Sequence, residues 1–121
     1  MSDGPVHAAY VFVGGGTGAV MRWAVGLWVP APWGTMAVNV LGSFGLALLL
    51  HPGLGVSPTW RLALGTGMMG GFTTYSTFNH DVISAMSEGR YGHAALVAGG
   101  SLVACVLGGL LGWWVAGLLR A

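Results

Sequence analysis

The sequence predicts an all-α membrane protein whose single domain, residues 1–121, contains four transmembrane helices. Hydrophobic residues make up 55% of the chain and charged residues only 6%, whereas a soluble domain carries about 25% charged residues. Four apolar runs each reach the ~20 residues that a helix needs to cross a membrane, where backbone polar groups must be satisfied within the chain. The predicted helices cover residues 8–29, 33–51, 60–86 and 94–119.

Loops are expected at three clusters of Pro, Gly and Ser, because such clusters interrupt helices. These clusters read "PAPWG", "HPGLGVSPT" and "SEGRYGH". The first seven residues contain Asp3 and no Lys or Arg, so no cleavable signal peptide is expected.

The first run contains Arg22, a charged residue inside an otherwise apolar segment. An ionisable group within a membrane is a functional candidate by default. A long side chain can also reach the membrane interface or bond loop carbonyls. We expect Arg22 to have a structural or electrostatic role near a vestibule.

The second run places Thr35, Asn39 and Ser43 at positions i, i+4 and i+8, which lie on one helix face. Two interpretations are open. The face either forms hydrogen bonds between helices, at about 0.6 kcal/mol per bond, or provides a polar track for a hydrated solute. Asn39 is the strongest member because an amide both donates and accepts hydrogen bonds.

The third run contains "GTGMMGGFTTYSTFNHD", residues 65–81, and its midpoint is Thr73. Glycine pairs and consecutive hydroxyl residues disfavour a straight helix, so we expect a break at this point. A break leaves backbone carbonyls without helical partners, and such hard oxygen ligands suit a small cation. The alternative interpretation is a glycine-rich packing kink.

Two aromatic residues, Tyr75 and Phe78, follow the expected break and lie three residues apart. They should project from about the same face of a helix. The positive edge of a ring can receive an anion without a formal charge, although packing is the commoner role of such a pair. Thr73 and Thr77 are expected to form an i, i+4 pair.

Glycines recur four residues apart within the first and fourth runs, as Gly14 with Gly18 and Gly108 with Gly112. Small residues at this spacing let helices approach closely within a membrane, so we assign them to packing. The single cysteine, Cys105, lies in the fourth run and is also expected to be a packing residue.

The sequence does not favour an enzyme or a side-chain metal site. His80 and Asp81 are adjacent, but no further His or Cys follows at a metal-binding spacing. No Ser–His–Asp order, phosphate-binding loop or paired carboxylate is present, and no basic patch favours nucleic-acid binding.

The four basic residues, Arg22, Arg61, Arg90 and Arg120, divide two against two between the sides of a four-helix membrane protein. Topology follows an excess of Lys and Arg on one side, and here neither side has an excess. Insertion in both directions, and hence an antiparallel dimer, is consistent with this balance.

Four segments are similar, in order, to motifs of one family. "GGGTGAVMRW" (14–23) is similar to a first-helix segment that ends in arginine, and "GTMAVNVLGSF" (34–44) to a "GTxxxNxxGxF" segment. "GGFTTYSTF" (70–78) resembles a "GGxTTFSTF" signature, and "EGRYG" (88–92) resembles a loop after the third helix. On these motifs the chain resembles the Fluc fluoride channels, also called CrcB, over nearly its whole length.

The resemblance implies a fluoride-selective channel that lets fluoride leave the cytoplasm passively and so reduces its toxicity. It implies an antiparallel, dual-topology homodimer with two pores in a bacterial inner membrane; a paralogue is the alternative partner. A structural sodium ion at the dimer centre would be bound by the backbone carbonyls of Gly70 and Thr73 from both subunits. Together with the polar face of the second run, the resemblance implies pore residues Asn39, Ser43, Tyr75, Ser76, Thr77 and Phe78, and it matches Arg22 to the family's arginine.

Tyr75 departs from the family pattern, which usually has phenylalanine at this position, and its hydroxyl would either stabilise fluoride or obstruct it. The fourth-helix segment "VAGGSLVAC" contains Ser101, a further hydroxyl whose position relative to the pore is open. Two alternatives to a channel are a small multidrug exporter, which requires a carboxylate within the membrane, and a non-transporting subunit of a membrane complex.

Overall fold

A computed structural model describes residues 4–120, and every regular element in this range is a helix. The all-α prediction is therefore confirmed. Two of the elements, α2 and α6, are long and apolar enough to cross a membrane by length and composition. In order, the elements are α1 (Gly4–Trp28), α2 (Trp33–Leu50), η1 (Pro52–Leu54), α3 (Pro58–Trp60), η2 (Arg61–Met69), α4 (Gly70–Phe72), α5 (Tyr75–Ser87) and α6 (Tyr91–Leu119).

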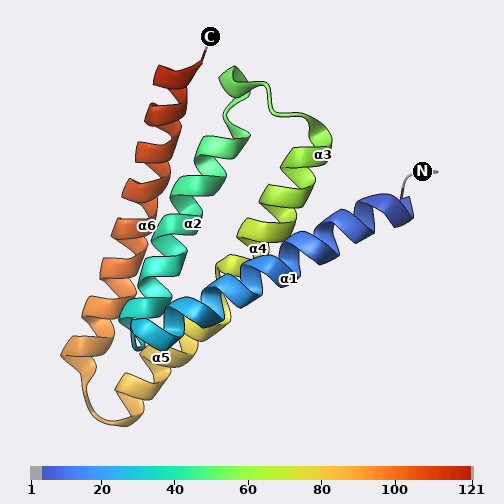
Figure 1. Cartoon of the computed structure of the whole chain (residues 1–121). Helices are drawn as coiled ribbons and strands as arrows, with labels where there is room; N and C mark the ends of the chain where they lie inside the picture. Colours follow the sequence, from blue (N-terminus) through green and yellow to red (C-terminus); the bar gives the residue numbers. More distant parts are fainter. Residues whose placement is uncertain (1–3, 121) are drawn as a thin grey trace.

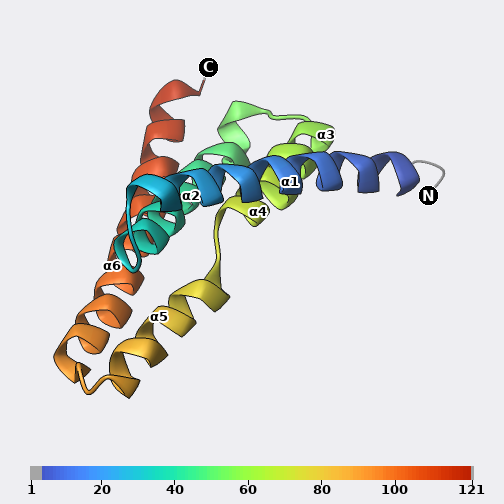
Figure 2. The ribbon, with the colours of Figure 1, turned by 60° about the horizontal axis from the view of Figure 1, so that its bottom comes forward.

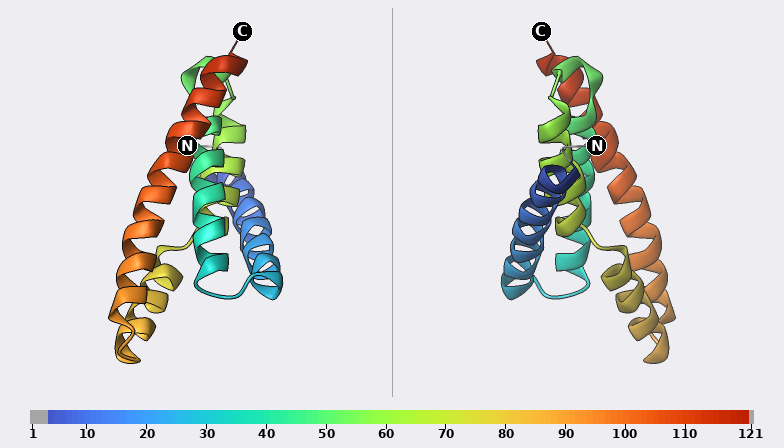
Figure 3. Two further views of the ribbon diagram at one scale, coloured as in Figure 1. Left: turned by 90° about the vertical axis from the view of Figure 1, so that its left-hand side faces the viewer. Right: turned by 90° about the vertical axis from the view of Figure 1, so that its right-hand side faces the viewer.

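Helices α2 and α6 lie side by side and run parallel over most of the length of α2, and theirs is the most extensive contact between elements of the described chain (Figure 1). Helix α1 crosses this pair at a steep angle and packs against η2 and α4 instead. Seen from the side, α5 and the first half of α6 diverge from α1 (Figure 3). The chain is therefore splayed at the end where α5 lies.

Glycine allows close helix contacts at two places in the fold. A Cβ atom added at Gly112 would collide with the carbonyl oxygen of Phe44, where α6 meets α2. A Cβ atom at Gly18 would collide with the Met68 carbonyl oxygen, where α1 meets η2. Gly14 and Gly108 are also close to neighbouring backbone, so the predicted packing role of the two glycine pairs is confirmed.

The third helical segment is divided, as the sequence predicts. It begins at Pro58, where Ser57 Oγ accepts a hydrogen bond from the Trp60 N–H at 3.4 Å, and continues as α3, η2 and α4. Thr73 and Thr74 then have extended backbone, with ψ angles of 155° and 115°. The chain leaves α4 through this short link and starts α5 in a new position (Figure 2). The break predicted at Thr73 is confirmed.

Several predicted boundaries were wrong by a few residues. Helix α1 begins at Gly4 rather than at residue 8, the third segment at Pro58 rather than at 60, and α6 at Tyr91 rather than at 94. Proline at the first position of the third segment already has the φ angle of a helix, which explains its earlier start. Gly89, with φ of 77°, makes the turn before α6, so the helix can begin at once.

The sequence also did not predict the π-helical character of η2, which covers nine residues, Arg61–Met69. Most π-helical segments are single turns within α-helices and occur frequently at functional sites. Here the π-helix leads directly into the break, through the three residues of α4.

Candidate functional site

The break in the third segment is held by the side chain of Asn39, from the middle of α2. Its Nδ2 donates a hydrogen bond to the Thr74 carbonyl oxygen at 3.0 Å, and its Oδ1 accepts one from the Thr74 N–H at 2.7 Å. One amide thus satisfies both backbone groups of a residue that has left the helix. Ser43, one turn further along α2, donates from Oγ to the Asn39 carbonyl at 2.7 Å.

Arg22 reaches the same break from α1. Its Nη1 donates a hydrogen bond to the Thr73 carbonyl oxygen at 3.2 Å. Thr73 is further fixed by its own hydroxyl, which donates to the Met69 carbonyl at 2.9 Å. Of the roles considered for Arg22, bonding a loop carbonyl is the one that the structure shows.

The first turn of α5 gathers the hydroxyls that follow the break. Thr74 Oγ1 accepts a hydrogen bond from the Thr77 N–H at 3.2 Å, and so caps the helix. The hydroxyls of Ser76 and Thr77 each lie 3.2 Å from the Thr74 hydroxyl. The expected i, i+4 pair of Thr73 and Thr77 was wrong, because Thr73 has extended backbone and Thr77 bonds to Thr74 instead.

Tyr75 and Phe78 project from the same face of α5, as their spacing predicts. Their ring centroids are 5.5 Å apart, and the ring planes are inclined at 58°. Tyr75 is 77% exposed, whereas Phe78 is only partly exposed. The pair therefore lies next to the break, and this chain does not enclose the Tyr75 ring.

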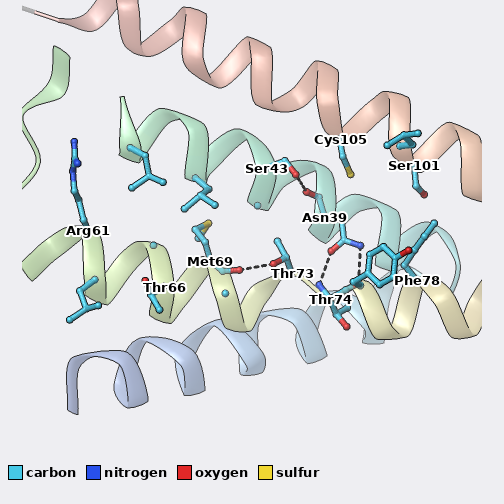
Figure 4. A pocket seen from close by; sticks show the side chains of 18 of the residues that line it. Asn39, Ser43, Arg61, Thr66, Met69, Thr73, Thr74, Phe78, Ser101 and Cys105 are labelled. Atoms are coloured by element: carbon cyan, nitrogen blue, oxygen red, sulfur yellow. Dashed lines mark hydrogen bonds between the residues drawn. The ribbon is translucent and has the colours of Figure 1, made fainter. Parts of the chain in front are cut away.

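A cavity of about 1040 Å³ lies between α2, the third segment and α6 (Figure 4). Of the predicted site residues, Asn39, Ser43, Gly70, Thr73, Tyr75 and Phe78 line it, whereas Ser76, Thr77 and Arg22 do not. Other residues that line it had no predicted position in the site, and those with polar or sulfur-containing side chains are Arg61, Thr66, Met69, Thr74, Ser101 and Cys105.

Ser101 is the most enclosed of the hydroxyls around this cavity. It is 4% exposed, and its Oγ is buried without a hydrogen-bond partner among residues 4–120. Figure 4 shows Ser101 and Cys105 on α6, above Asn39 on α2. A buried hydroxyl without a partner is available to a bound molecule or ion.

A second cavity, of about 250 Å³, lies on the α1 side of the break and is lined by Arg22, Thr35, Thr74 and Thr77, among others. Thr35 is therefore separated from Asn39 and Ser43, although all three lie on α2 with helical spacing. Thr74 lines both cavities. The break thus forms part of the wall between a larger cavity and a smaller one.

The carbonyls around the break are suited to a hard cation. The Thr74 N–H, which would be the α-helical partner of the Gly70 carbonyl, is bonded to Asn39 instead. The Gly70 carbonyl is therefore free of its usual donor, and Gly70 is exposed. The Thr73 carbonyl accepts one hydrogen bond from Arg22 and retains a second lone pair. Both oxygens are chemically able to bind sodium.

Comparison with known proteins identifies the family. The family model described as "CrcB-like protein, Camphor Resistance (CrcB)" matches residues 9–113. The chain belongs to the CrcB family. This CrcB chain is 40% identical to the fluoride-specific ion channel FluC of Acidobacterium capsulatum, over 93% of this chain and 97% of that one. The FluC proteins of Serratia proteamaculans and Variovorax paradoxus are 40% and 42% identical, over 88% and 81% of this chain and 94% and 87% of theirs. The resemblance found in four sequence motifs is confirmed.

The sequence of this CrcB chain did not show which residues of its fourth helix line the cavity. Ser101 and Cys105 are four residues apart on α6, which places them on one face. Because α6 is apolar on all sides, nothing in its pattern indicates which face meets the cavity. Thr74 had a weak signal, since it adjoins the predicted break.

Proposed function

We propose that this chain is the subunit of a fluoride-selective channel that lets fluoride leave the cytoplasm passively. Curated relatives named as fluoride-specific ion channels match it at 40–42% identity over most of both chains. The observation that carries the proposal is the larger cavity, in which an amide, several hydroxyls and an aromatic pair surround a helix break. This combination supplies hydrogen-bond donors and ring edges next to one another.

The chemistry of the larger cavity suits a small, strongly hydrated anion. Fluoride gives up its water only where donors replace it, and the Asn39 amide and the Ser101 hydroxyl are placed to do so. The edges of Tyr75 and Phe78 add positive electrostatic potential without a fixed charge. No carboxylate is among the residues that line this cavity, so none repels an anion there.

The proposed assembly is an antiparallel homodimer in a bacterial inner membrane, with all four helical segments crossing the bilayer. The larger cavity has rim residues that the single chain leaves exposed, including Tyr75 at 77% and Leu102 at 67%. A second copy would cover these side chains and complete the wall. The balanced distribution of the four arginines supports insertion of the two copies in opposite directions.

A sodium ion at the centre of the dimer is proposed as a structural cofactor. The Gly70 and Thr73 carbonyls of each subunit would bind it, since both lie at the break and have a free lone pair. When bound, the ion would supply positive charge that offsets the cost of bringing an anion into a low-dielectric region. The chain itself holds the Thr73 carbonyl in place through Arg22.

The alternative functions receive less support. A multidrug exporter needs a carboxylate facing its substrate path, and the two cavities have none among their lining residues. A non-transporting subunit would not need an amide and hydroxyls around a break. Neither alternative agrees with the names of the curated relatives.

A growth experiment tests the cellular role. Bacteria that cannot export fluoride are given this chain, and their growth is measured with increasing sodium fluoride in the medium. The proposal predicts growth at fluoride concentrations that stop cells carrying an empty vector. Equal sensitivity of both strains, with the protein present in the membrane, would refute it.

A further inference from the structure

Arg61 is the only charged residue among those that line the larger cavity. It is the first residue of η2, directly after the short helix α3. In Figure 4, Arg61 lies at one end of the cavity, whereas Asn39, Thr74 and Phe78 lie at the other. The cavity therefore has a cation at one end and neutral hydrogen-bonding groups at the end nearest the break.

Arg61 forms none of the side-chain hydrogen bonds or ion pairs found among residues 4–120. Its Nε is buried without a hydrogen-bond partner, and the ion pair found among residues 4–120 joins Arg90 to Glu88. Arg22, by contrast, donates to the Thr73 carbonyl. A buried charged donor without a partner is unfavourable, so an anion that accepts its hydrogen bond is stabilised there.

The walls next to Arg61 strengthen its attraction for an anion. Leu50 and Leu62 line the same cavity, and low-dielectric walls concentrate the field of a charge. Thr66 follows five residues later and also lines the cavity. Five residues is the hydrogen-bond spacing of a π-helix, so this hydroxyl continues the wall from Arg61 toward the break.

We propose that Arg61 is an anion-capture site that concentrates fluoride at this end of the cavity before the ion reaches Asn39. The inference rests on the proposed fluoride channel and adds a recruiting residue to it. Capture by charge acts on the local concentration of the anion. Its loss is therefore expected to lower flux when fluoride is scarce and to be overcome when fluoride is abundant.

The test compares fluoride flux into liposomes for wild type, Arg61→Gln, Arg61→Lys and the control Arg120→Gln, at low ionic strength. Arg120 is exposed at the end of α6, so its replacement removes the same charge away from the cavity. At low fluoride, Arg61→Gln should reduce the initial rate by about tenfold, and the difference should vanish at saturating fluoride. Arg61→Lys and Arg120→Gln should stay close to wild type.

A second measurement uses only the wild-type protein. Potassium gluconate, whose anion is bulky, is added at constant low fluoride, and the rate should fall as salt screens the charge. Equal low-fluoride rates for wild type and Arg61→Gln would overturn the capture site, as would a loss of equal size in Arg61→Gln and Arg61→Lys at every fluoride concentration. If Arg61→Gln does not fold, a wild-type rate that is insensitive to gluconate overturns it. A wild type without fluoride flux instead refutes the proposed function.

Discussion

Asn39 and Thr74 are joined by two hydrogen bonds of opposite direction, at 3.0 and 2.7 Å, across the break in the third helical segment. The two residues are 35 positions apart in sequence, and their contact connects α2 to the start of α5. An amide nitrogen has two N–H groups, and Thr74 accepts only one of them. These two hydrogen bonds therefore fix the orientation of the Asn39 side chain. They leave one of its two N–H groups at the cavity wall, where it can donate to an anion.

Asn39→Asp tests this relationship. A carboxylate keeps the acceptor for the Thr74 N–H but replaces the donor with an oxygen that repels both the Thr74 carbonyl and an approaching anion. Two like charges 4 Å apart at an effective dielectric of 20 repel by about 4 kcal/mol, so fluoride flux should fall by well over tenfold. Flux from liposomes measures this. The control is Asn79→Asp, the same change at an exposed position of α5. Asn39→Asp flux equal to that of Asn79→Asp would remove Asn39 from the pore.

Tyr75→Phe tests whether the unusual hydroxyl of the aromatic pair meets the ion. Tyr75 is 77% exposed, so the change should leave stability within about 0.5 kcal/mol. A hydrogen bond contributes about 0.5–1.5 kcal/mol, so the fluoride flux should change by about twofold or more. Tyr91→Phe, at another exposed tyrosine, should have no effect on flux. Indifference of flux to both changes would place the Tyr75 hydroxyl outside the path.

Gly112→Ala tests the packing of α6 against α2. The added Cβ would collide with the Phe44 carbonyl, which is backbone and cannot rotate away. Overpacking of this kind costs about 1–3 kcal/mol, and the melting temperature in detergent should fall accordingly. Gly99→Ala is the matched control on the same helix, because its added Cβ would meet no atom within 4 Å. Similar melting temperatures for the two variants would contradict the close contact.

Arg22→Gln tests the support of the break from α1. Removing the bond from Nη1 to the Thr73 carbonyl takes away a charged hydrogen bond, which contributes about 1.5–3 kcal/mol. The melting temperature in detergent should fall by more than in Arg90→Gln, whose ion pair with Glu88 is about half exposed and contributes about 0–1 kcal/mol. An Arg22→Gln variant as stable as Arg90→Gln would show that the break does not depend on Arg22.

Those features that depend on local pattern were predicted well. Glycines and hydroxyls around Thr73 predicted the break, and glycine spacing predicted close contacts such as the one at Gly112. The π-helix of Arg61–Met69 was not predicted from its residue pattern. The pairing of Asn39 with Thr74, and the separation of Thr35 from Asn39, are tertiary effects. They follow from where the broken segment meets α2, which helical spacing alone does not specify.

The α6 residues that line the cavity could not be predicted from the sequence, for a different reason. Leucine, valine and glycine cover every face of this helix, so no face is distinguished by its polarity. The sequence shows a hydroxyl at Ser101 but does not indicate which neighbouring helix its face meets. Only the packing of α6 on α2 brings Ser101 and Cys105 to the same cavity as Asn39.

The most direct test of the proposed function is ion efflux from liposomes that contain the purified protein. Vesicles loaded with potassium fluoride or with potassium chloride are diluted into salt without that anion, and valinomycin balances the charge. A fluoride electrode and a chloride electrode record the release. The account predicts rapid fluoride efflux, with chloride release no faster than from protein-free vesicles. No fluoride efflux, or chloride efflux at the same rate, would contradict it.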